Sequence, residues 1–114
     1  MKFLMTYEST SKEPPSQEQL VAISKYTEEQ IRAGVVLMTG GLQRPTKGTH
    51  VRFTAGKFSV TDGPFAETKE LIDGFALVEA ASREEATRIA ESFMRVAGDG
   101  EGEILQVFDG GPPG

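Results

Sequence analysis

The 114-residue chain contains no cysteine, and this absence excludes several kinds of chemistry. Without a thiol the protein can form no disulfide bond, use no thiolate nucleophile and offer no sulfur ligand to a metal ion. The composition fits the reducing cytoplasm, where we expect the protein to be located. The single histidine, His50, has no second ligand at a suitable spacing, so we expect no metal site and no cofactor.

Long apolar runs and an excess of positive charge are missing as well. No run approaches the roughly 20 apolar residues that a membrane-spanning helix needs, and the apolar stretch in the opening MKFLMTYEST is too short for a signal peptide. Seventeen acidic and twelve basic residues give a net charge of −5. Because nucleic-acid binding normally requires a basic surface, we expect no nucleic acid as a partner. Because no long apolar run is present, we expect no membrane as a partner either.

The residues that are present suffice for one globular domain over positions 1–114. A chain of this length can bury roughly two-thirds of its unfolded surface around a single core. The hydrophobic share of 38% and the charged share of 25% are ordinary for a globular protein. The end of the chain at 110–114 is rich in glycine and proline, and we expect it to fray.

Local patterns place the elements along the chain. Ser16 with Gln19, and Ser82 with Glu85, have the spacing of a capping box, in which the two side chains satisfy each other's free amides at a helix start. A glycine follows each apolar helical stripe and should end the helix. We expect strands at 2–7, 35–42, 71–80 and 103–108, helices at about 16–33 and from 82 to Gly98, and a hairpin formed by 49–54 and 57–61.

The predicted hairpin has a regular alternation around Ala55-Gly56. Val51 and Phe53 would share one face with Phe58 and Val60, because side chains alternate along a strand and meet across a tight turn. One face of the hairpin is therefore expected to be apolar.

The order β-α-β-(hairpin)-β-α-β predicts an α+β fold of the ferredoxin-like, split β-α-β type with an added hairpin. Both helices should cover one face of an antiparallel sheet. The opposite face would carry apolar side chains, for which the candidates are Phe3 or Leu4, Phe75 or Ala76, and Leu105 or Val107. No third element is predicted to cover that face, so we expect a homodimer joined sheet to sheet.

The segment TDGPFAETKE, residues 61–70, lies between the hairpin and the next strand. Gly63-Pro64 favours an extended turn, and Asp62 can accept amide hydrogen bonds two residues further on. The structural interpretation is a turn anchored by Phe65. The functional alternative is that a carboxyl buried beside Phe65 holds its proton more tightly, so that Asp62 acts as an acid or base.

Three stretches of the chain resemble one protein family. They are DGPFAETKELIDGF at 62–75, MTGGLQRP at 38–45 and the opening MKFLMTYE. The sequence is similar to the DGPF-domain family within the YCII-related superfamily, and the similarity covers nearly the whole chain. The resemblance implies ferredoxin-like subunits that form a dimeric α/β-barrel, with a cleft beside the sheet of each subunit.

The resemblance also bears on function. In the wider superfamily a histidine–aspartate pair in the cleft is proposed to be catalytic, and Asp62 matches the aspartate by motif. His50 lies in the predicted hairpin and does not match the helix-associated position of the histidine. Many family members are encoded beside alternative sigma factors of the extracytoplasmic-function type, which implies a regulatory setting.

Further candidates for ligand contacts are polar or aromatic. They are Phe65, Glu67, Thr68, Lys69, His50 and Tyr7. Tyr7 and Tyr26 are candidate proton donors, and Tyr7 would face either the helices or the dimer interface. A local basic cluster could attract an anionic ligand and consists of Arg44, Lys47, His50, Arg52 and Lys57. The structural alternative for both sets is a solvated turn and hairpin.

Two functions are therefore open from the sequence. The first is a small-molecule protein in which Asp62 acts as acid or base in an enclosed pocket and Phe65 excludes water. The second is a non-catalytic regulatory or scaffolding module, with a flat exposed patch and a link to a sigma factor.

Overall fold

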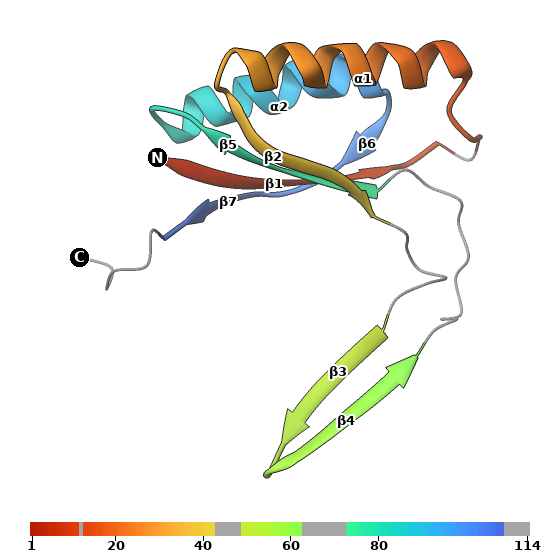
Figure 1. Cartoon of the computed structure of the whole chain (residues 1–114), viewed down its shortest axis with the longest axis vertical. Coiled ribbons are helices and arrows are strands. Elements are labelled where there is room, and N and C mark those ends of the chain that lie inside the picture. Colours follow the sequence, from red (N-terminus) through yellow and green to blue (C-terminus); the bar gives the residue numbers. More distant parts are fainter. Residues whose placement is uncertain (12, 43–48, 63–72, 109–114) are drawn as a thin grey trace.

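The computed structural model describes residues 1–11, 13–42, 49–62 and 73–108 (Figure 1). In these ranges the fold is α+β, with two helices and antiparallel strands. In chain order the elements are β1 (Lys2–Ser9), α1 (Gln17–Arg32), β2 (Val36–Leu42), β3 (Thr49–Thr54), β4 (Lys57–Asp62), β5 (Asp73–Glu79), α2 (Arg83–Ala97), β6 (Gly100–Glu101) and β7 (Ile104–Val107). No helix in these ranges is long and apolar enough to cross a membrane.

The larger sheet has the strand order β2-β5-β1-β6, and β7 also pairs with β1. β5 pairs with β1 from Lys2 to Glu8, while β6 and β7 pair with different parts of the other edge of β1. All of these pairings are antiparallel. The described strands form this open sheet and a separate two-stranded one, so they do not close into a barrel.

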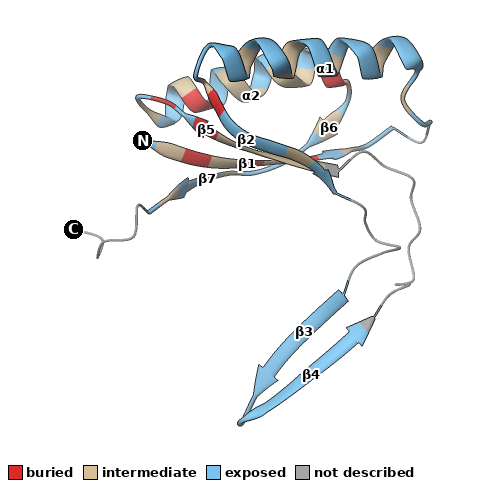
Figure 2. Ribbon diagram, viewed as in Figure 1, coloured by how far each residue is buried: buried red, intermediate tan, exposed pale blue. Residues whose placement is uncertain are grey.

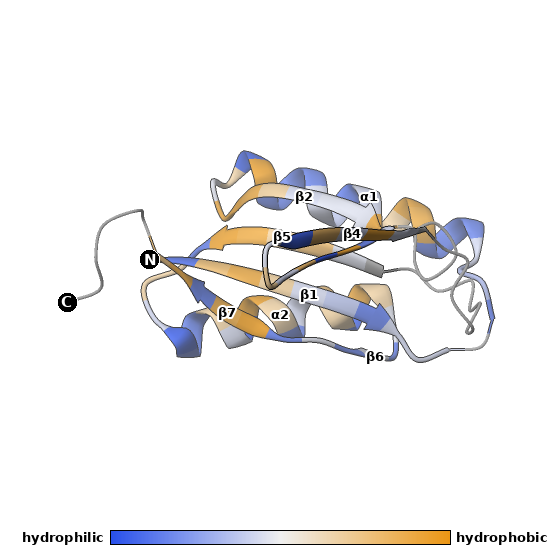
Figure 3. Ribbon diagram, turned by 90° about the horizontal axis from the view of Figure 1, so that it is seen from below, coloured by the Kyte–Doolittle hydropathy of each residue, from blue (hydrophilic) through white to orange (hydrophobic). Residues whose placement is uncertain are grey.

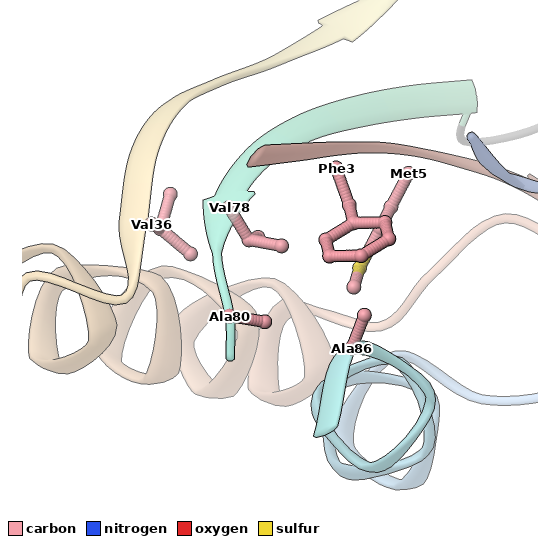
Figure 4. Packing of buried hydrophobic residues seen from close by; sticks show 6 residues of the cluster. All are labelled: Phe3, Met5, Val36, Val78, Ala80 and Ala86. Atoms are coloured by element: carbon pink, nitrogen blue, oxygen red, sulfur yellow. The ribbon is translucent and has the colours of Figure 1, made fainter. Parts of the chain in front are cut away.

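Both helices lie on one face of the larger sheet, as expected (Figure 1). The side chains of β1 that alternate toward the helices are buried, and they are Phe3, Met5 and Tyr7. Figure 4 shows Phe3 and Met5 pointing toward Ala86 on α2. Phe3 is opposite Val78 on β5, and each side chain is only 1% exposed. The core therefore lies between the centre of the sheet and α2 (Figure 2).

The opposite face of the sheet, here called the outer face, is apolar across its full width. Leu4 is in register with Leu77 on one side and with Leu105 on the other, and Leu77 is in register with Met38. This row joins β2, β5, β1 and β7, and Figure 3 shows the apolar strands from that side. Phe75 pairs with Thr6, which places it on the outer face also. The register thus selects Leu4, Phe75, Leu105 and Val107 for the outer face and Phe3 and Ala76 for the core.

The first helix is attached less firmly than its pattern predicted. Leu20 is 44% exposed and Ile31 is 50% exposed, and α1 contains no buried residue. The Ser16 hydroxyl caps the helix by accepting a hydrogen bond from the Gln19 amide at 3.1 Å. The capping box also predicted that the Gln19 side chain accepts a hydrogen bond from the Ser16 amide. That prediction is wrong, because the Gln19 side chain donates to the Ala97 carbonyl at the end of α2.

The second helix and the chain after it follow the prediction with two differences. The Glu85 amide donates to the Ser82 hydroxyl at 3.1 Å, as expected, but the Glu85 carboxylate accepts from the Ala81 amide at 3.1 Å instead of from the Ser82 amide. No strand was expected between the helix that ends at Gly98 and the strand at 103–108, but β6 pairs there with the end of β1. Glycine permits this close approach, since an added Cβ at Gly102 would lie 1.8 Å from the Thr6 carbonyl oxygen.

The hairpin of β3 and β4 has the predicted register. Val51 is opposite Val60 and Phe53 is opposite Phe58. The turn residues Ala55 and Gly56 have φ values of 52° and 77°, as a two-residue hairpin turn requires. The hairpin projects away from the outer face of the larger sheet (Figure 1).

Candidate functional site

A groove of about 1530 Å³ opens between α1, α2 and the helix-facing side of the sheet. Its lining includes Tyr26 and Thr27 from α1, Ile89 and Phe93 from α2, and Met5 and Ala76 from the sheet. The groove exists because α1 covers the sheet without burying any side chain. Small-molecule sites usually occupy about 300–1000 Å³, so a compact ligand would fill only part of this space.

Glycines form the floor at one end of the groove. Gly74 on β5 is opposite both Tyr7 on β1 and Gly41 on β2. Residues in register share a face of the sheet, so Gly41 and Gly74 lie on the same side as the buried Tyr7 ring. Two adjacent strands therefore present bare backbone to the groove, where any other residue type would present a side chain.

An aromatic cluster forms the wall beside this floor. The Tyr7 and Phe93 rings meet edge to face with centroids 5.3 Å apart, and the Tyr26 and Phe93 rings are tilted at 6.3 Å. Phe93 on α2 thus contacts both Tyr7 on β1 and Tyr26 on α1. Aromatic rings in such arrangements attract one another and offer edges and faces to a flat ligand.

The Tyr7 hydroxyl is committed to the backbone. It donates to the Gly98 carbonyl at 2.9 Å, and the Asp99 carbonyl lies within 3.2 Å. Burial raises the pKa of Tyr7 above its usual value, a hydrogen bond with Ser9 opposes the rise, and the negative charge of Asp99 adds to it. The hydroxyl therefore stays neutral at physiological pH and fixes the chain where α2 ends.

The predicted site residues are only partly within the described ranges. Tyr7 faces the helices and the groove, which decides between the two orientations left open by the sequence. His50 is exposed on β3, opposite Thr61, in a different sheet from Tyr7. The backbone of Asp62 ends β4 opposite Thr49. Four predicted residues, Phe65, Glu67, Thr68 and Lys69, lie outside the described ranges, as do Arg44, Lys47 and the tail at 110–114.

The hairpin part of the basic cluster is solvated. His50, Arg52 and Lys57 are all exposed on β3 and β4. Their position away from the larger sheet separates them from the groove, so the described residues do not bring His50 and Tyr7 into one site. In the described ranges there is also no group of three His, Asp or Glu side chains arranged to hold a metal ion.

A family model for the YCII-related domain matches residues 1–109 of the chain. The chain belongs to the YCII-related family. One curated relative is an uncharacterized protein of Rhizobium meliloti (strain 1021), which is 38% identical over 68 residues. That match covers 60% of this chain and 55% of the relative, so it spans about half the length of the curated protein. Membership confirms the YCII-related resemblance.

Proposed function

We propose that this YCII-related protein is a homodimer that binds a compact, mainly apolar small molecule in the groove of each subunit. The observation that carries the proposal is the glycine floor formed by Gly41 and Gly74 beside the Tyr7 ring. The floor, the aromatic wall and the loosely seated α1 leave room in a place where a small domain usually has packed core. A flat ring compound fits the edges and faces offered by Tyr26 and Phe93.

The homodimer accounts for the outer face. Met38 is 60% exposed and Leu105 is 49% exposed, at the two ends of a row that also includes Leu4 and Leu77. An apolar surface that extends over four strands is uncommon in a monomer and usually marks an interface. A second ferredoxin-like subunit stacked on this face would produce the dimeric α/β-barrel that the family resemblance implies.

Asp62 is the acid or base in this proposal. It is the last residue of β4, and the segment that follows it carries the DGPF sequence and continues to β5. A catalytic step would need a second positioned group beside Asp62. Replacement by asparagine should leave binding in the groove intact while removing any proton transfer.

The groove is tested with the apolar dye 8-anilinonaphthalene-1-sulfonate as a probe. Thr27→Phe places a ring in the groove on a helix that has no buried residue, so folding should tolerate it. Ala22→Phe is the matched control, because Ala22 is exposed on the same helix and does not line the groove. We expect Thr27→Phe to weaken dye binding about tenfold, because the added ring occupies part of the space beside Tyr26 and Phe93 where the dye would bind, and Ala22→Phe to leave it unchanged.

Equal dye binding by the two variants would contradict the groove as the site. Native mass spectrometry of freshly purified protein adds an independent measurement. It should show a dimer with up to one retained small molecule per subunit, and Thr27→Phe should lose that added mass while remaining dimeric. Retained mass that survives Thr27→Phe would place the ligand elsewhere.

A further inference from the structure

We propose that the β3–β4 hairpin, residues 49–62, is an arm that packs its apolar face against the second copy of the chain. The inference rests on the homodimer of the proposed function and adds a specific contact to it. The observation that supports it is that two exposed apolar surfaces, the apolar face of the arm and the outer face, lie on the same side of the molecule.

The arm is sharply two-sided. Residues in register across an antiparallel pair share a face, so Val51, Phe53, Phe58 and Val60 form an apolar patch on one face, which ends at the polar Thr49–Asp62 pair at the base of the arm. The other face carries the pairs His50 with Thr61 and Arg52 with Ser59, all of them polar. This division is expected for a ribbon that has one covered and one solvated side.

The apolar face of the arm is uncovered within a single subunit. Phe53 is 73% exposed and Phe58 is 65% exposed, while Val51 and Val60 are 56% and 53% exposed. An isolated two-stranded hairpin is marginally stable in water. Its apolar face therefore needs a packing surface for the arm to hold one conformation.

The arm lies on the side of the sheet opposite to the helices (Figure 1). Seen from that side, β4 lies in front of the larger sheet near β5, with the outer face behind it (Figure 3). The radius of gyration is 16.3 Å, compared with about 13 Å for a compact chain of this length. A second subunit seated on the outer face must therefore occupy the space beside the arm.

The area that a stable dimer needs favours this contact. With side-chain areas of roughly 150–200 Å², the exposed fractions of Met38 and Leu105 give the outer face on the order of 200 Å² of apolar surface. The four apolar side chains of the arm contribute about 400 Å² by the same reckoning. The arm thus supplies most of a combined area of about 600 Å², which approaches the roughly 800 Å² per partner of a standard interface, while the outer face alone resembles a weak contact.

The arm's contact is tested first by asking which chain it touches. The protein has no cysteine, so Val60→Cys provides a single attachment point for a benzophenone photocrosslinker. The chain that carries the crosslinker is mixed with a tenfold excess of wild-type chain that carries no crosslinker and is uniformly labelled with ¹⁵N. We expect the crosslinked peptides to come mainly from the ¹⁵N chain. Adducts confined to the labelled chain itself would show that the arm folds onto its own sheet and would overturn the inference.

Sedimentation equilibrium then measures the contribution of the arm to the dimer. Phe53→Ser with Phe58→Ser should raise the dimer dissociation constant about 100-fold or more, given the burial of two aromatic rings. The control is His50→Ser with Arg52→Ser, on the opposite face of the same arm, and it should stay within about threefold of wild type. Phe53→Leu with Phe58→Leu keeps the face apolar and should fall between them.

The outcomes separate the arm from the dimer itself. If the serine variant dimerises like wild type while Leu105→Glu becomes monomeric, the arm contact is wrong and the dimer stands. If wild type is monomeric at 10 μM, the dimer and the arm both fail. Adducts only with a different protein, such as an added sigma factor, would assign the arm to that partner and contradict the inference.

Discussion

Tyr7 lies directly opposite Gly74 in the ladder between β1 and β5, so no cross-strand side chain covers its ring on that side. The ring instead packs on Phe93, and the hydroxyl crosses to the Gly98 carbonyl at the end of α2. One residue of the first strand thus borders the groove and holds the second helix in place. The groove and the attachment of α2 are coupled through this side chain.

Tyr7→Phe should therefore lower the free energy of unfolding by about 1 kcal/mol, since it removes one buried hydrogen bond and keeps the ring. Tyr26→Phe is the matched control, because the Tyr26 hydroxyl makes no hydrogen bond within the part of the chain that the structure describes. Urea unfolding at pH 7 measures both. Equal stabilities of the two variants would contradict the role assigned to the Tyr7 hydroxyl.

The pH dependence of stability should carry the signature of Tyr7. Burial raises its pKa in the folded protein above the ordinary value near 10, so folding favours the protonated form. The stability that this group contributes is fully present below about pH 10 and is lost as pH rises through the folded pKa. Wild type should lose stability more steeply than Tyr7→Phe between pH 10 and 12, as measured by urea midpoints. Parallel curves would show that Tyr7 is not buried.

Gly98 and Gly34 follow the two helices and allow a paired test of backbone strain. Gly98 has φ 102°, and an added Cβ would lie 2.8 Å from Gln19 Nε2, which holds α1 to α2. Gly34 has φ 76° with nothing within 4 Å of an added Cβ. Gly34→Ala should cost about 1 kcal/mol from the backbone alone, and Gly98→Ala about 2–3 kcal/mol. Thermal unfolding of both variants measures which one loses more stability. A larger loss for Gly34→Ala than for Gly98→Ala would contradict the packing at Gly98.

The sequence predicted the elements well because their signals are local. The alternation of Phe3, Met5 and Tyr7 predicted a strand on which these three side chains share a face, and the structure shows that this face is the buried one. The Ala55-Gly56 turn predicted the register of the hairpin. Both depend on residues within a few positions of one another. The apolar outer face also followed, since two helices can cover only one side of a sheet.

The groove could not be predicted in the same way. It depends on the register that places Gly41 opposite Gly74, and that register joins segments more than thirty positions apart. The apolar side chains of α1 recur at helical spacing, and this pattern alone resembles that of a helix packed on the core. Periodicity shows which side of a helix is apolar but not how deeply that side is buried. The strand β6 was missed because two residues carry too little pattern to detect.

The central claim, that the outer face is covered by a second copy of the chain, is tested most directly by sedimentation equilibrium of wild type and Leu105→Glu. Leu105 is 49% exposed at the end of the apolar row, so a carboxylate there should be harmless to a monomer. In a dimer it would be buried without a partner charge, at a cost of several kcal/mol. We predict a wild-type dimer at 10 μM and a folded Leu105→Glu monomer. A wild-type monomer at that concentration, or a Leu105→Glu dimer of unchanged affinity, would contradict the account.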